Sequence, residues 1–94
     1  MRHAETTEQF FIRISLLEER RENGSHLDRL HGLTALLEPM SVRARMDGEV
    51  IARNMKSYAW TIRTQLPQGQ LKSRLRDIIG IDDLLAITPI MGDG

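Results

Sequence analysis

Residues 71–90, LKSRLRDIIGIDDLLAITPI, decide the fold that the sequence predicts. Apolar side chains recur here at the spacing of one face of an amphipathic helix, at Leu71, Leu75, Ile78 and Ile79. Gly80 follows, and helices commonly end at glycine because it adopts the left-handed conformation at little steric cost. The run LLAIT at residues 84–88, stopped by Pro89, is short enough to be a strand. The stretch therefore predicts a helix that leads through a glycine turn into a terminal strand.

The segment QFFIRISLL at residues 9–17 favours a strand. Its large apolar side chains alternate, and it contains two phenylalanines and two isoleucines, which are typical of strands. A helix is the alternative, because Phe10, Ile14 and Leu17 also fall on one helical side. A charged connector follows and ends in the turn signal Asn23-Gly24.

A helix is predicted between Ser25 and Glu38. Ser25 suits the N-cap because its hydroxyl accepts from a free backbone N–H, and Asp28 lies near the positive end of the helix dipole. Leucines continue at helical spacing, and Pro39 blocks further helix.

From residue 41 onward the period changes to two. Val42, Ala44 and Met46 alternate with charged residues, which predicts a half-buried strand whose apolar side faces the core. Gly48 either closes a tight hairpin with Asp47 or forms a bulge in a longer strand. Residues 58–65 alternate again and predict another strand.

The predicted order is strand, helix, strand, strand, helix, strand. This is an α+β, ferredoxin-like βαββαβ arrangement, a four-stranded antiparallel sheet with both helices on one face. The alternative is an all-α bundle, because residues 48–66 also carry helical spacing and could form one long helix. The length fits one domain over residues 1–94, with residues 1–8 and 91–94 expected as disordered tails.

This pattern resembles the ACT and related ferredoxin-like regulatory domains. Their second half typically reads as an amphipathic helix, a glycine-centred turn and a last strand, as residues 71–90 do. ACT domains that bind amino acids resemble one another in a glycine-bearing loop after the first strand. Asn23-Gly24-Ser25 stands there, after a longer charged connector than that pattern usually has. The resemblance implies regulation of another protein and a ligand site at these three residues.

Composition narrows the classes of function. The chain has no cysteine, which excludes disulfides, thiolate metal sites and cysteine nucleophiles. No apolar run is long enough for a membrane span, and we expect a cytoplasmic protein. The net charge is zero, but residues 41–76 hold eight basic and two acidic side chains between acidic flanks. Such asymmetry indicates either an anion-binding face or neutralisation between the parts of the folded chain.

Strand alternation predicts a cluster of arginines on the face of the sheet that no helix covers. Its expected members are Arg13, Arg43, Arg45 and Arg63. Such a cluster would bind a small anionic ligand or an acidic partner protein, unless nearby glutamates neutralise it. Nucleic acid is less favoured because only Phe11 is available there for base stacking.

The sequence contains no catalytic constellation. His26 and His31 are five residues apart, a spacing that turns them to different helical sides and predicts surface histidines rather than metal ligands. The serines lack a glycine-elbow context, and no glycine-rich phosphate loop occurs. We therefore expect a non-catalytic regulatory or interaction domain without metal or cofactor, which forms a homodimer through its edge strands. The alternative is a helical adaptor or nucleic-acid-binding regulator that uses the basic residues 43–76.

Overall fold

The structure of the chain is a computed structural model that describes residues 7–18, 24–52 and 54–90. Strands and helices follow one another in the predicted order, with a short 3-10 helix after the first helix. The elements are β1 (Glu8–Leu17), α1 (His26–Leu37), η1 (Glu38–Met40), β2 (Met46–Ala52), β3 (Met55–Thr64), α2 (Gln68–Arg76) and β4 (Leu84–Ile90). Strand β1 already includes Glu8, which the sequence had placed in a tail, and residues 1–6 and 91–94 of the expected tails lie outside the described ranges.

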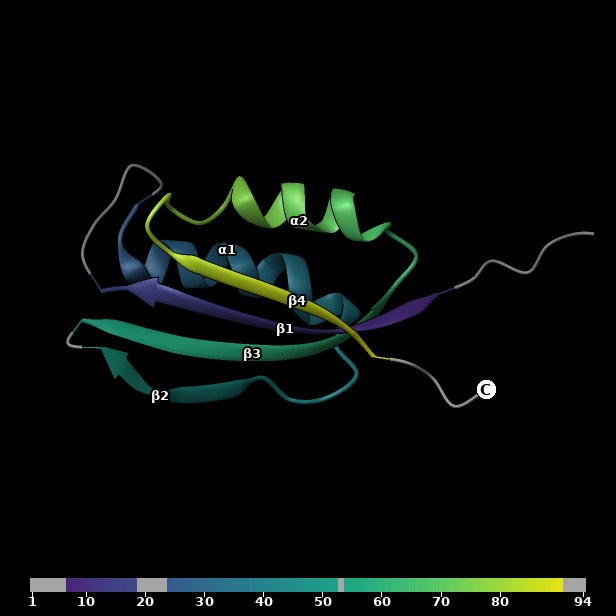
Figure 1. Ribbon diagram of the computed structural model, residues 1–94, viewed down its shortest axis with the longest axis horizontal. Coiled ribbons are helices and arrows are strands. Elements are labelled where there is room, and N and C mark those ends of the chain that lie inside the picture. The colour runs from purple at the N-terminus through teal and green to yellow at the C-terminus, as the bar shows by residue number, and fades with distance from the viewer. Residues whose placement is uncertain (1–6, 19–23, 53, 91–94) are drawn as a thin grey trace, which may run out of the picture.

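The four strands form one antiparallel sheet in the order β2-β3-β1-β4. Figure 1 shows both helices on the same side of this sheet. The order and the placement of the helices are those of a ferredoxin-like arrangement, so the predicted α+β fold is confirmed. The all-α alternative is wrong, because residues 48–66 contain the end of β2 and the whole of β3.

The hydrophobic core lies between the sheet and the two helices. Side chains two residues apart in β1 and β3 enter it, which confirms the strand interpretation of residues 9–17. Full burial of an aliphatic or aromatic side chain stabilises the fold by ~1.5–3 kcal/mol, so this layer is the main source of stability. Its buried members are Phe10, Ile12, Ile14, Leu16, Leu30, Leu33, Leu37, Tyr58, Trp60, Ile62, Leu71, Leu75 and Ile79.

The helices begin and end close to where the sequence predicts. Ser25 caps the start of α1, as expected, and Asp28 completes a capping box by accepting from the backbone N–H of Ser25. Helix α2 ends at Arg76 rather than near Ile79, although Ile79 still reaches the core from the following turn. Strand β4 continues through Pro89, which an edge strand tolerates because one of its sides makes no ladder. Within the described part of the chain, no helix has the length and apolarity needed to cross a membrane.

Residues 41–47 alternate between the two faces of the sheet, as predicted. Each set of side chains, however, lies on the face opposite to the predicted one. Ser41 bridges to Ile62, which faces the helices, and Met46 pairs with Ala59, which faces away from them. Val42 and Met46 are consequently 43% and 59% exposed on the uncovered face. A pairing shifted by one residue exchanges the two faces of a strand, so the prediction of a core-facing apolar side is wrong. That prediction concerned Val42, Ala44 and Met46.

Gly48 lies inside β2, where the ladder with β3 shifts its register between Asp47 and Val50. The bulge interpretation is therefore confirmed and the tight hairpin at Gly48 is wrong. A Cβ atom at Gly48 would lie 2.8 Å from the carbonyl oxygen of Ser57. Real Cβ atoms do not approach a backbone oxygen so closely, so β2 passes over Ser57 only because this residue is glycine.

A buried ion pair joins three connections at one end of the sheet. Arg29 on α1 and Asp83 before β4 are both fully buried, with Nε and Oδ2 3.0 Å apart but not aligned as a hydrogen bond. The Arg29 guanidinium also donates to the carbonyl oxygens of Gly24 and Leu17. The Asp83 carboxylate accepts from the backbone N–H of Leu17 at 2.9 Å and of Gly80 at 2.7 Å. The pair ties the end of β1, the entry to α1 and the turn before β4 into one network.

Replacing the buried acid should be far more costly than replacing an exposed one. We expect Asp83→Asn to lower the free energy of unfolding by ~3–5 kcal/mol, because Arg29 then keeps its charge inside the protein without a counter-charge. Asp47→Asn is the matched control: its ion pair with Arg45 has side chains 59% and 32% exposed, and about 1 kcal/mol or less is expected. Urea unfolding followed by circular dichroism measures both. Equal losses would contradict a central role for the buried pair.

The close approach at the bulge predicts that alanine will affect stability differently at Gly48 and at Gly69. Gly48→Ala should destabilise the protein by ~1–3 kcal/mol, because the new methyl group meets the backbone carbonyl of Ser57 as well as its hydroxyl. Gly69→Ala is the control, since nothing lies within 4 Å of its added Cβ and it stands in α2. There alanine should be neutral or stabilising by up to ~1 kcal/mol. The thermal unfolding midpoints of the two variants measure this difference, and an unchanged midpoint for Gly48→Ala would refute the packing argument.

Candidate functional site

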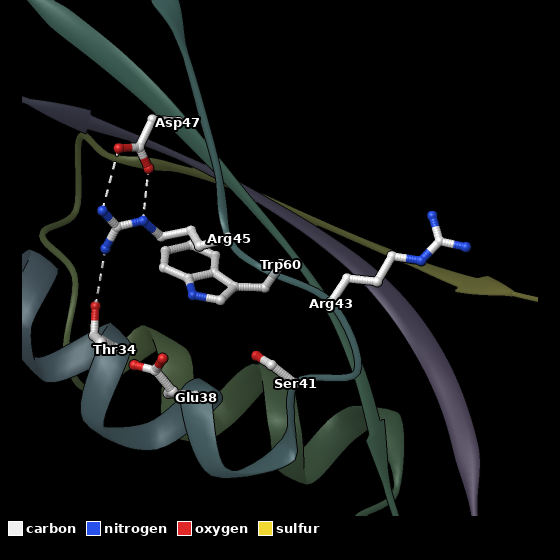
Figure 2. Close-up of a pocket in the computed structure, with 7 residues that line it drawn as sticks. All are labelled: Thr34, Glu38, Ser41, Arg43, Arg45, Asp47 and Trp60. Carbon is white, nitrogen blue, oxygen red and sulfur yellow. Dashed lines mark hydrogen bonds and ion pairs between the residues drawn. The ribbon is translucent and has the colours of Figure 1, made fainter.

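A pocket of about 350 Å³ opens between the end of α1, η1 and the segment that leads into β2 (Figure 2). Four of its seven lining residues are alternate residues of this segment, so the pocket exists because of the reversed faces described above. The buried indole of Trp60, the only tryptophan of the chain, forms its inner wall. The lining residues are Thr34, Glu38, Ser41, Arg43, Arg45, Asp47 and Trp60.

Arg45 is held in place by three contacts. Its guanidinium forms a two-pronged ion pair with Asp47, at 2.6 Å from Nε to Oδ1 and 3.2 Å from Nη2 to Oδ2. Its Nη1 lies 3.3 Å from the hydroxyl of Thr34 on α1, and the group sits 5.4 Å from the ring centre of Tyr58. The hydrogen bond to Asp47 raises the pKa of Arg45 more than burial lowers it. Arg45 thereby connects the segment before β2 to α1 as a fixed positive charge.

Tyr58 lies beneath Arg45 and is bonded to the start of α1. Its hydroxyl is 2.8 Å from Nε2 of His26, whose Nδ1 is 3.3 Å from the carbonyl oxygen of Leu17. Because a carbonyl oxygen only accepts, Nδ1 of His26 is the donor in the contact with Leu17. Burial raises the pKa of Tyr58, Asp47 raises it further, and Arg45 opposes the shift. His26 is therefore half-buried and hydrogen-bonded, whereas the sequence predicted a surface histidine.

Two charged side chains at the pocket, those of Arg43 and Glu38, form no ion pair with the described residues. Arg43 makes no hydrogen bond or ion pair with the residues that the structure describes, and Figure 2 shows its guanidinium extending away from Arg45 at the rim. The carboxylate of Glu38, in η1, lies in the field of Arg45 and likewise forms no hydrogen bond or ion pair within the described ranges. The pocket thus offers one available positive group and one available negative group.

The hydroxyl groups of the pocket are already used by the backbone. Ser41 Oγ donates to the carbonyl oxygen of Leu37 at 2.8 Å, and Thr34 Oγ1 donates to that of Leu30 at 2.9 Å. Neither hydroxyl has a base positioned to remove its proton, which an activated nucleophile requires. Among the described residues, no three histidine, aspartate or glutamate side chains are grouped to hold a metal ion.

The predicted cluster of four arginines on one face does not form. Arg13 and Arg63 are exposed on the uncovered face, where Arg13 stacks over Phe11 at 5.8 Å. Arg43 and Arg45 lie on the helix side because of the changed register, so the structure brings only these two of the four to the pocket.

The predicted loop site lies at the other end of α1. Gly24, with a φ of 108°, gives its carbonyl oxygen to Arg29, and Ser25 caps the helix, so both have structural partners. Asn23 lies outside the described residues. A helix of twelve residues spans about 18 Å, so this loop and the pocket are separate sites.

The sequence pattern alone did not predict the buried ion pair of Arg29 with Asp83 or the hydrogen bond of Tyr58 to His26. Arg29 precedes Leu33 by four residues and Leu37 by eight, so it stands on the core-facing stripe of α1. A charged residue at such a position is a signal for a buried partner. Nothing in the local sequence identifies Asp83 as that partner, because the two residues meet only through the packing of α1 against the turn before β4.

Comparison with protein-family models, with curated proteins and with solved structures found no match to the chain. The resemblance to ACT domains therefore stays a prediction.

Because Tyr58 is the only tyrosine of the chain, the absorbance of phenolate reports its ionisation directly. We expect titration above the ordinary pKa of 10.0 in the folded protein. Asp47→Asn should lower the midpoint, since it removes a negative charge, and Arg45→Gln should raise it. Because the folded pKa is raised, Tyr58 contributes stability below pH 10 that is lost as the pH rises through the folded value. Identical midpoints in all three proteins would contradict this electrostatic arrangement.

Proposed function

We propose that the chain is a non-catalytic regulatory or interaction domain that binds a small carboxylate ligand in the pocket beside Trp60. The observation that carries this proposal is Arg43, a guanidinium at the pocket without a partner among the described residues. The planar guanidinium can bind both oxygens of a carboxylate at once. The indole wall offers apolar surface to the rest of such a ligand.

The charges of the pocket favour a singly charged anion. Arg45 and Asp47 neutralise each other, which leaves Arg43 and Glu38 to act on the ligand. One carboxylate balances Arg43, whereas the second charge of a phosphate would be repelled by Glu38. The volume of about 350 Å³ lies near the lower end of small-molecule sites, which run from ~300 to ~1,000 Å³.

The position of the pocket supports a regulatory role. Its walls come from α1 and η1 on one side and from the approach to the edge strand β2 on the other. A ligand that contacts both sides stabilises their arrangement by mass action and thereby changes the edge that a partner would meet. The homodimer expected from the edge strands belongs to this proposal, because β2 and β4 are the edge strands of the sheet that the described residues form.

The alternative based on basic residues 43–76 receives less support. The helical adaptor part of it does not fit the α+β fold. Among the described basic residues of this segment, Arg43 and Arg45 line the pocket, and Arg63 is exposed on the uncovered face of the sheet. Lys72, Arg74 and Arg76 are exposed on α2. Because nucleic-acid backbones require phosphate contacts collected on one surface, this distribution favours the pocket proposal.

Fluorescence of the single tryptophan tests the pocket directly. We expect saturable changes on titration with acetate or benzoate at constant ionic strength, and a weaker response to phosphate. Arg43→Gln should weaken carboxylate binding by roughly tenfold or more, because it removes a charge-assisted hydrogen-bonding group.

Arg63→Gln is the matched control, since it removes the same group from the opposite face of the sheet. It should leave the titration unchanged. The proposal fails if none of the carboxylates gives a saturable response, or if the two variants lose it equally.

A further inference from the structure

We infer that β4 pairs antiparallel with β4 of a second copy of the chain, about a two-fold axis at Ile87, to give a continuous eight-stranded sheet. This inference deepens the homodimer of the proposed function and is independent of the ligand pocket. It rests on the shape, the charge and the spacing of apolar residues along the two free edges of the sheet.

The two edges differ in regularity. Strand β4 pairs with β1 over seven consecutive residue pairs without a register shift (Figure 1). Strand β2, at the other edge, shifts register twice, and its bulge at Gly48 interrupts the row of backbone groups that a new strand would need. Bulges are one of the devices that protect edges from pairing, and β4 has none. Its only protective residue is Pro89, which removes at most one donor N–H from each copy.

The edges also differ in charge. Strand β4 reads LLAITPI and contains no ionisable side chain, whereas the segment 45–49 at the other edge contains Arg45, Asp47 and Glu49. Two copies of β4 can therefore meet without repulsion between like charges. A partner of strong charge has nothing on this strand to recognise, which favours a second copy over an acidic or basic protein.

The spacing of the exposed apolar residues fits a two-fold axis. Leu84 and Ile90 are 57% and 39% exposed, lie on the uncovered face and stand at equal distances in sequence from Ile87. Antiparallel pairing about Ile87 places Leu84 of each copy opposite Ile90 of the other copy. The same register places Ala86 opposite Thr88 on that face. The arrangement buries both large exposed side chains of the strand against each other.

Analytical ultracentrifugation over a concentration series tests the association, with charges introduced at the central pair. We expect a dimer for the native chain. Ala86→Glu and Thr88→Lys should each raise its dissociation constant by roughly tenfold. The double variant A86E/T88K should restore the native value, because each new acid then faces a new base across the axis. Both positions are exposed, so the monomer should keep its circular dichroism spectrum.

Met46→Lys is the control at the other edge, where Met46 is 59% exposed, and it should leave the dimer intact. A native chain that stays monomeric at all concentrations would show that β4 does not pair with a second copy, and would overturn the inference. So would a dimer that is indifferent to the β4 changes, or a double variant that is weaker than both single ones. Carboxylate titration of Trp60 on the same samples reports the pocket separately, so failure of either proposal is distinguishable.

Discussion

The buried contact between Arg29 and Asp83 is the constraint on which the rest of the structure depends. Removing two opposite charges from water is expensive, and the cost is offset only where hydrogen bonds satisfy the remaining atoms. Here backbone groups of Leu17, Gly24 and Gly80 do so. The network places both helices relative to β1 and brings the chain to the start of β4. Hydrophobic burial supplies most of the stability, while this pair selects one arrangement of the connections.

The second constraint is the register with which the segment before β2 pairs with β3, because it determines where the pocket forms. Ser41 opposite Ile62 turns Arg43, Arg45 and Asp47 toward α1, and a polar pocket forms where the sequence predicted apolar packing. An edge strand that extends beyond the helices gains little by burying apolar groups, because no second layer covers them fully. The two-pronged pair of Arg45 with Asp47 and its contact with α1 are compatible with such a partly exposed place.

The proposals use different parts of the same sheet. The pocket is a consequence of the charged segment that leads into β2, and its available guanidinium favours a carboxylate. Strand β4 is regular, uncharged and apolar on its uncovered face, which favours pairing with itself. A protein of 94 residues buries a limited fraction of its surface, so either kind of binding would add appreciably to its stability.

The sequence by itself determined the order of elements, the core-facing residues of β1 and β3, and the N-cap of α1 at Ser25. These features follow from local periodicity and from local hydrogen bonds, which a single sequence displays. Only the tertiary structure decided which face the residues of segment 41–47 occupy, since alternation specifies two faces but not which of them meets the core. It also decided the partners of Arg29 and His26, because residues far apart in the chain meet there through packing alone.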